Sequence, residues 1–265
     1  MRSFLYLISI LIFISLASCV SSSSTSNSMS NKNSSEEPDM VSGSKLNVQL
    51  GVGYMQRGQY KVAKEKLEKA IEQDPENIQA FTTLALLMDK LNEKDKAEEY
   101  YLEAIDLKPD NTWLHNSYGT FLCGIGRLED AMAEFKIAYN DPFYETAYLA
   151  RSNAGSCLVQ NGKYAEAEPL LRAALRTDSK LPGALLSMAE IGVMTKRYLM
   201  SRAYIQRYHM VNKASSESLW LQVQAEKALK AKEHYLKYAD QLLNHFPDSK
   251  EAGLLTDMMR KDNTN

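Results

Sequence analysis

The chain has 265 residues, of which 45% are hydrophobic, and its 31 basic and 33 acidic side chains give a formal net charge of −2. Because the basic and acidic side chains nearly balance, the chain has no strong positive field, which argues against binding to nucleic acid or to anionic lipid through charge. The length suits either one ordinary globular domain or one extended array of repeats.

The first 18 residues predict a targeting segment. Arg2 supplies a positive end, an apolar run extends from Phe4 to Leu16, and small residues precede Cys19. A segment of this kind is a signal peptide that is removed, not a membrane span of the mature protein.

The sequence LASC at residues 16–19 resembles a bacterial lipobox. In a lipobox, signal peptidase cuts before the cysteine, whose thiol then carries a diacylglycerol. An ordinary secretory peptide cut after Ser18 and an uncleaved anchor are the alternatives. Acyl chains such as palmitate contribute about 0.8 kcal/mol per buried CH₂, so a triacylated Cys19 would hold the protein on a membrane. Val20 follows the cysteine, and the lack of Asp there resembles lipoproteins sorted to the outer membrane.

Residues 19–44 are predicted to be the lipidated cysteine followed by a flexible, disordered tether. The segment is rich in Ser and Asn and has no apolar periodicity, so it cannot bury enough surface to offset its ordering entropy. A random coil of this length has a typical reach of roughly 25–30 Å.

Residues 45–250 repeat a pattern of small and large side chains with a period of 34. In the clearest unit, these positions are Gly119, Leu122, Gly126, Ala131, Phe135, Ala138 and Pro142. The order returns at residues 51–75 and 85–109, and again from Gly155 after a two-residue insertion near residues 143–147. Such a pattern resembles the tetratricopeptide repeat, which implies paired antiparallel helices stacked into a right-handed superhelix.

The expected fold class is therefore all-α, with about six helix pairs behind the signal peptide and tether. Gly58, Gly126 and Gly162 are predicted to form the turn inside their pairs. The fifth repeat is weaker, and the last pair keeps only helical apolar spacing and Pro247. Residues 251–265 are predicted to be a C-terminal tail.

The sequence predicts no enzyme, no cofactor, no metal site and no small-molecule substrate. Its four histidines have no carboxylate or second histidine at metal-ligand spacing, and no nucleophile elbow or phosphate loop occurs. An array of short repeats is better suited to binding proteins.

Cys123 and Cys157 fall on the first helices of the third and fourth repeats, which lie side by side in such an array. In an oxidising periplasm the two thiols are candidates for a disulfide that closes a loop worth roughly 3–4 kcal/mol. The alternative is a pair of small buried packing residues.

First helices also line the binding groove of such an array. The candidate partner-binding residues at the groove positions are Val48, Val52, Met55, Leu86, Trp113 and Asn116. The first four form an apolar stripe suited to a hydrophobic segment of a partner. Alternatively, Val48 and Val52 contact the N-terminal tether or a neighbouring helix.

Three longer runs carry a closer resemblance: NSYGTFLCGIGRLEDAMAEFKIAYNDPFY, NAGSCLVQNGKYAEAEPLLRAAL, and SLWLQVQ with HFPDS near the end. Together with the lipobox and both cysteines, they resemble the PilF/PilW family of type IV pilus biogenesis lipoproteins. The resemblance implies a pilotin, which is a lipoprotein on the periplasmic face of the outer membrane that helps the pilus secretin to localise and assemble. A generic periplasmic adaptor for envelope assembly or cell-wall hydrolases is the alternative.

Overall fold

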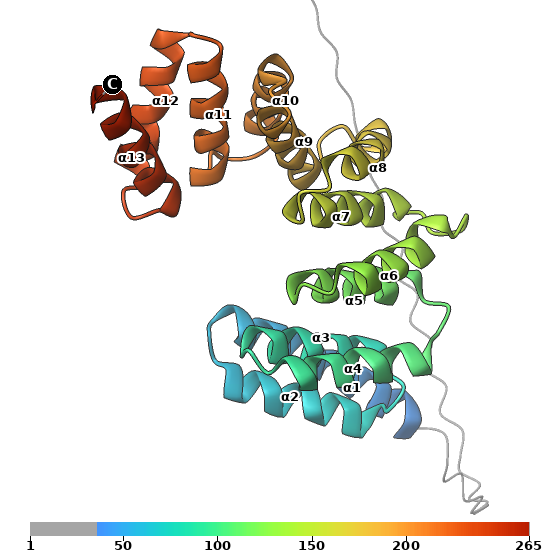
Figure 1. The fold of residues 1–265 in the computed structure, drawn as a ribbon. Helices are drawn as coiled ribbons and strands as arrows, with labels where there is room; N and C mark the ends of the chain where they lie inside the picture. Colours follow the sequence, from blue (N-terminus) through green and yellow to red (C-terminus); the bar gives the residue numbers. More distant parts are fainter. Residues whose placement is uncertain (1–35, 265) are drawn as a thin grey trace, which may run out of the picture.

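The computed structural model describes residues 36–264, which form thirteen α-helices and no strand (Figure 1). The predicted signal peptide, Cys19 and most of the predicted tether lie outside the described residues. The helices are α1 (Glu36–Gln56), α2 (Tyr60–Gln73), α3 (Ile78–Lys90), α4 (Lys94–Leu107), α5 (Thr112–Gly124), α6 (Leu128–Asn140), α7 (Ala147–Gln160), α8 (Tyr164–Thr177), α9 (Pro182–Met194), α10 (Tyr198–Val211), α11 (Ser216–Ala228), α12 (Lys232–His245) and α13 (Lys250–Thr264).

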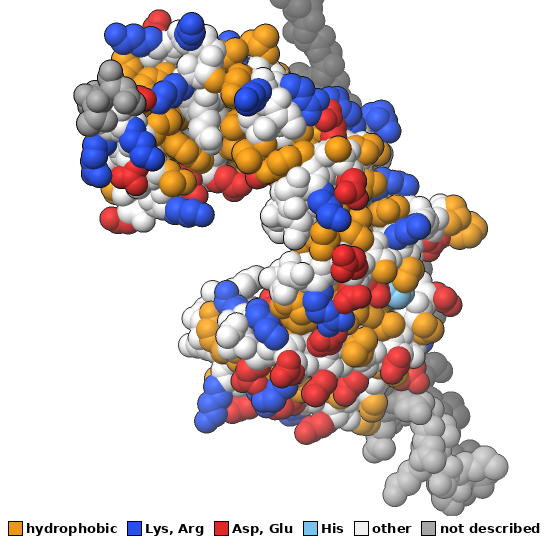
Figure 2. All heavy atoms as spheres, in the orientation of Figure 1, with side chains coloured by type: hydrophobic (Ala, Val, Ile, Leu, Met, Phe, Trp, Pro, Cys, Tyr) orange, Lys and Arg blue, Asp and Glu red, His pale blue; other side chains and the backbone are white. Residues whose placement is uncertain are grey.

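Consecutive helices pack as six pairs, from α1 with α2 to α11 with α12, and the pairs stack on one another. The stack curves, and the space-filling view shows a hollow between its α1–α4 end and its α11–α13 end (Figure 2). The predicted all-α tetratricopeptide architecture of about six helix pairs is therefore confirmed. Within the described part of the chain, no helix has both the length and the apolar content needed to cross a bilayer.

Close approach within a pair depends on the anchor glycines. A Cβ atom on Gly155 would lie 2.6 Å from Cγ of Leu171, and one on Gly119 would lie 3.0 Å from the ring of Phe135. Both large side chains are buried in the opposite helix of the pair. The sequence therefore repeats small and large residues because the two helices of each pair pack at close separation, with a large side chain of one against a small residue of the other.

The turn inside each pair requires a left-handed backbone residue. Gly58, Gly126 and Gly162 have φ values of 72°, 82° and 71°, as the sequence predicts. In the second repeat, Asn92 takes the same place with φ 63°. In the fifth and sixth repeats, however, lysines take this position. A lysine has a Cβ atom, so its left-handed backbone is strained where that of glycine is not.

The connection between α6 and α7 is longer than its counterparts. Asn140 ends α6 and Ala147 begins α7, which leaves six residues between them, whereas four residues separate α4 from α5. The extra two residues are those that the sequence places near residues 143–147. They carry Phe143, which is 91% exposed.

The predicted tether is too long at its C-terminal end, because α1 begins at Glu36. The Ser44 side chain is buried and donates to the carbonyl of Ala70 at 2.7 Å, while the Asn77 amide donates to its hydroxyl at 2.8 Å. Polar residues thus pack α1 against its neighbours, so an apolar periodicity does not mark where the helix begins.

The predicted C-terminal tail is also wrong. Residues 250–264 form α13, and Ala252 and Leu255 are buried with Leu219 and Leu242 in a core shared with α11 and α12. A thirteenth helix covers the last pair, as capping elements do in repeat arrays.

Candidate partner-binding groove

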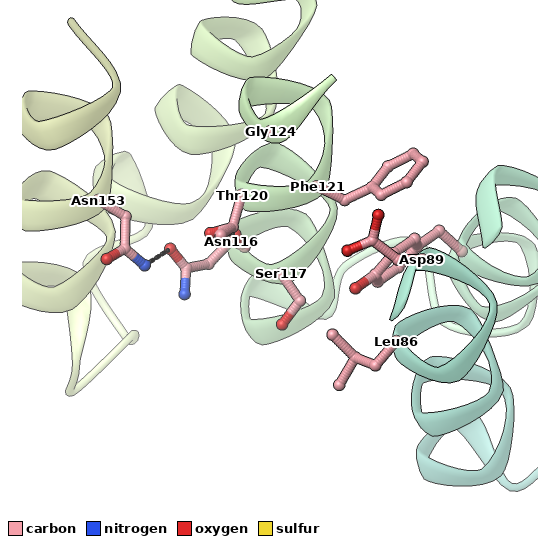
Figure 3. A pocket seen from close by; sticks show the side chains of 9 residues that line it. Leu86, Asp89, Asn116, Ser117, Thr120, Phe121, Gly124 and Asn153 are labelled. Atoms are coloured by element: carbon pink, nitrogen blue, oxygen red, sulfur yellow. Dashed lines mark hydrogen bonds between the residues drawn. The ribbon is translucent and has the colours of Figure 1, made fainter. Parts of the chain in front are cut away.

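The first helices of the second, third and fourth repeats line a groove. A cavity of about 290 Å³ lies in it between α3 and α5 (Figure 3). It is lined by Leu86, Asp89, Tyr101, Asn116, Ser117, Thr120, Phe121, Gly124 and Asn153. Leu86 and Asp89 on α3 face Ser117 and Phe121 on α5 across it (Figure 3).

An aromatic cluster accounts for this opening. The ring of Tyr101 on α4 lies 5.6 Å from that of Tyr118 and 5.3 Å from that of Phe121, both on α5. These rings pack at the junction of the second and third repeats. Close backbone contacts join α1 to α3, α5 to α7 and α7 to α9, but α3 and α5 make few. The rings therefore hold two first helices apart and leave the cavity between them.

A second cavity of about 320 Å³ continues the groove toward α7. Thr120, Gly124 and Asn153 line both cavities. The disulfide between Cys123 and Cys157 lies in the wall of the second, with Cα atoms 5.9 Å apart and sulfur atoms 2.08 Å apart. The covalent link thus ties α5 to α7 where the groove passes between them.

Amide and hydroxyl groups dominate the middle of the groove. The Asn153 amide donates to the Asn116 carbonyl oxygen at 3.0 Å (Figure 3). Farther along, the hydroxyls of Ser156 and Ser187 lie 2.9 Å apart and link α7 to α9. Uncharged groups that both donate and accept hydrogen bonds can bind the main chain of a peptide.

Equivalent positions change character along the concave face. The same position in the first helices of the six repeats is occupied, in chain order, by Val52, Leu86, Thr120, Ser156, Glu190 and Gln224. The first two side chains are 37% and 47% exposed. The groove is thus apolar at its N-terminal end and polar beyond. At the fifth place, burial raises the pKa of the Glu190 carboxyl, and the charge of Glu217 adds to the shift.

Charged groups beside the cavity between α3 and α5 are paired. Lys94 binds Asp89 at 2.5 Å. The Glu98 carboxylate accepts from the Tyr118 hydroxyl and from Arg127, each at 2.6 Å. The Tyr118 bond and then the Arg127 guanidinium hold the pKa of Glu98 below its usual range despite partial burial. Glu98 therefore stays ionised and fixes the aromatic cluster in place.

Comparison with known proteins identifies the fold and the family. Models of the tetratricopeptide repeat match residues 54–105, 125–182 and 152–209. The chain is 30% identical to the type IV pilus assembly protein PilF of Pseudomonas aeruginosa over 77% of its own length and 81% of that protein. It belongs to the PilF/PilW family.

Solved structures agree with that assignment. The crystal structure of PilW, described as a widely conserved type IV pilus biogenesis factor, matches with a TM-score of 0.72 and 31% identity, over 80% of this chain and 98% of that one. The structure of Pseudomonas aeruginosa PilF matches with a TM-score of 0.72 and 28% identity, over 83% and 99%. This PilF/PilW protein thus matches nearly the whole length of both solved chains.

Five of the six predicted groove residues of this PilF/PilW chain fall into three groups. Leu86 and Asn116 line the first cavity. Val52 and Trp113 are exposed, at 37% and 42%, but do not line it. Met55 is half-buried against the core.

Val48 requires a correction, because it is only 2% exposed and belongs to the core cluster of the first repeats. Its side chain contacts neighbouring helices, as the alternative interpretation of the sequence had it, and is not available to a partner. Counting positions from the repeat start therefore predicts a groove residue only where the neighbouring helix does not cover the first helix.

The sequence also missed members of the groove. Tyr101, Phe121 and Asn153 line the cavities but do not stand at the places counted as groove positions. The cavity arises from the aromatic cluster between two repeats, a contact between residues on different helices. The nearest signal in the sequence is the run of aromatic residues at 100, 101, 118 and 121.

Among the described residues, no group of three or more His, Cys, Asp or Glu side chains is placed to hold a metal ion. One of the histidines, His115, links two helices through hydrogen bonds. Nδ1 of His115 on α5 lies 2.6 Å from Oε2 of Glu134 on α6, and Nε2 donates to the carbonyl oxygen of Pro109 at 2.8 Å. This PilF/PilW groove therefore offers shape, apolar surface and hydrogen bonds.

Proposed function

We propose that the protein is a pilotin: an outer-membrane lipoprotein that binds the type IV pilus secretin and promotes its localisation and assembly into multimers. The observation that carries the proposal is the relationship to PilF and PilW, which extends over nearly all of the described array. PilF is a type IV pilus assembly protein, and PilW is a type IV pilus biogenesis factor.

The groove supports a role in binding a segment of another protein. Leu86 lines its first cavity, and Val52 presents an exposed apolar side chain at the equivalent position of α1. Asn116 and Asn153 supply amide groups farther on. A segment with apolar side chains at one end and an extended main chain beyond it would match both features. In the proposed role, that segment belongs to the secretin.

The lipid anchor is the second part of the proposal. Cys19 in the lipobox would carry the acyl chains, and residues 20–35 would join the anchor to α1. Two or more acyl chains give stable attachment to a membrane. An array attached in this way would meet secretin subunits at the membrane in which they assemble.

Deletion of the gene tests the function. We expect surface pili to disappear and the secretin to be largely monomeric or mislocalised, while pilin subunits are still made. The wild-type chain supplied from a plasmid should restore secretin multimers in outer-membrane fractions. Normal secretin multimers in the deletion strain would make the generic envelope adaptor the better assignment.

The anchor is tested separately with Cys19→Ser and a radiolabelled fatty acid. Wild-type protein should incorporate the label and fractionate with the outer membrane, whereas Cys19→Ser should accumulate as an unlabelled precursor. A wild-type protein that takes up no label would show that the segment is not a lipoprotein signal.

A further inference from the structure

A second hollow surface lies on α9–α13, at the opposite end of the stack from α1–α4 (Figure 1). A cavity of about 560 Å³ has apolar walls formed by Val193, Met194, Tyr198, Ala228 and Met258. A neighbouring cavity of about 270 Å³ is lined in part by Tyr235, and the two adjoin at Lys227. We call these two cavities together the C-terminal surface.

The C-terminal surface has a basic rim. Its lining residues include four lysines and one carboxylate. That carboxylate, Glu226, is 1% exposed and already accepts from Nε of Arg202 at 2.9 Å. Lys227 is paired with Asp262 at 2.5 Å. Lys196, Lys230 and Lys232 form no ion pair with any residue that the structure describes, so their positive charges are available to a partner.

Two of these lysines stand where the backbone disfavours them. Lys196 and Lys230 have φ values of 59° and 57° and occupy the turn position that is glycine in the first, third and fourth repeats. A residue with a Cβ atom is strained there, and glycine is the residue that relieves the strain. Strained backbone residues cluster at ligand clamps and other functional sites. Both lysines lie on the rim of the C-terminal surface.

We propose that the C-terminal surface binds a protein segment in which acidic side chains stand next to apolar ones. The apolar side chains would enter the cavity beside Met194 and Met258, since methionine adapts to varied partners. The acidic side chains would meet Lys196 and Lys230 at the rim. Because the secretin groove is a different surface, failure of this proposal would leave the proposed function standing.

A protein segment fits the surface better than an anionic lipid. Its apolar side chains line a cavity of about 560 Å³, which can take up the side chains of a protein segment. The charge is also specific to this end, because the cavity between α3 and α5 has no lysine in its lining and includes Asp89. The two ends of the array therefore present different chemistry to partners.

Direct binding to the full chain tests the proposal. The probe is a fluorescein-labelled ten-residue peptide in which aspartates alternate with leucines, and matched peptides carry asparagine or lysine in place of aspartate. Fluorescence anisotropy should give an apparent Kd for the aspartate peptide at least about tenfold lower than for the asparagine peptide, with binding weakened by salt. The lysine peptide should not bind.

The key variant is Lys196→Gly/Lys230→Gly, which removes two charges and relieves the strained turns. We expect the apparent Kd for the aspartate peptide to rise about tenfold while Tm stays level or increases. Asn92→Gly makes the same backbone change in the second repeat without removing a lysine, and it should leave Kd unchanged. A structural role for the lysines predicts a lower Tm instead.

Three results would overturn the proposal. One is equal binding of the aspartate and lysine peptides, and another is an unchanged Kd in the double glycine variant. The third uses phosphatidylglycerol vesicles: if the aspartate peptide does not bind but vesicle binding falls in the glycine variant, the surface contacts lipid and not an acidic protein segment.

Discussion

Cys123 on α5 and Cys157 on α7 join the first helices of neighbouring repeats in the wall of the groove, with their Cα atoms 5.9 Å apart. Repeat arrays are held together by contacts between adjacent units only. A covalent link between two units at the centre of the stack therefore limits how far the groove can open between α5 and α7.

Removing the link should lower stability. The 34-residue separation corresponds to about 3–4 kcal/mol in the chain-entropy estimate. We expect Cys123→Ala and Cys157→Ala each to lower Tm by about 6–15 °C under oxidising conditions, and the double variant to be no worse than either single one. Under reducing conditions the wild type should fall to the same level. Two titratable thiols in the native, unreduced protein would refute the link.

The contact between Gly155 and Leu171 predicts a steric effect. A Cβ atom at residue 155 would lie 2.6 Å from Cγ of a fully buried leucine, so Gly155→Ala should destabilise the array by about 1–3 kcal/mol. Gly253 is the matched control, because a Cβ atom there meets nothing within 4 Å. Gly253→Ala should stabilise α13 by about 0.5–1 kcal/mol. Urea denaturation measures both, and equal effects at the two sites would contradict the packing role of Gly155.

The pairing of His115 with Glu134 predicts a pH dependence. The hydrogen bond to the carboxylate raises the pKa of His115 above its ordinary value of 6.5, against the effect of burial. The folded chain thus binds the proton more tightly than the unfolded chain. The contribution to the free energy of unfolding is complete below pH 6.5 and is lost as pH rises through the raised pKa, by at most about 1.4 kcal/mol per pH unit.

His209 has the opposite effect on stability, because burial lowers its pKa. Its contribution to the free energy of unfolding is present above pH 6.5 and is lost as pH falls through the lowered pKa. The test therefore compares variants and not the wild type alone. Urea denaturation from about pH 5.5 to about pH 8.5 should show the His115-dependent loss in wild type and its absence in His115→Asn and in Glu134→Gln. If the wild type and both variants change in parallel over this range, the pair has no role in stability.

The sequence predicted the fold because the repeat pattern is made of local constraints. Anchor glycines face large residues only 16 positions later, and the turn glycines lie inside a single helix pair. The turns of the fifth and sixth repeats were not predicted, because lysine meets the same backbone constraint there. Lys196 and Lys230 take left-handed turns that nothing in a lysine signals. The last helix, 250–264, was missed because its apolar positions lack the repeat pattern.

The groove was less predictable because it depends on contacts between repeats. Its position follows from rings on α4 and α5 that hold α3 and α5 apart. Counting positions from the repeat start therefore gave Leu86 and Asn116, which line the first cavity, but also Val48, which lies in the core. The same limit applies to His115, whose carboxylate partner lies on the next helix.

The groove itself can be separated from the core by charge substitution. Val52 and Leu86 hold equivalent positions on α1 and α3 and are 37% and 47% exposed. Val52→Lys and Leu86→Lys should therefore change the free energy of unfolding by no more than about 0.5 kcal/mol. Each lysine would place a charge where the proposed secretin segment must bury apolar side chains, so we expect binding to weaken at least about tenfold.

Leu102→Lys provides the matched control. Leu102 is 45% exposed but stands on α4, a second helix, and lines no cavity of the groove. It should leave secretin binding unchanged, as measured by co-purification from outer-membrane fractions, while circular dichroism reports an intact helical array in all three variants. A lower Tm for Val52→Lys or Leu86→Lys would assign that side chain to the core. Intact Tm with undiminished secretin binding would instead place the secretin contact elsewhere on the array, because a buried apolar segment cannot accommodate an unpaired lysine without a large loss of affinity.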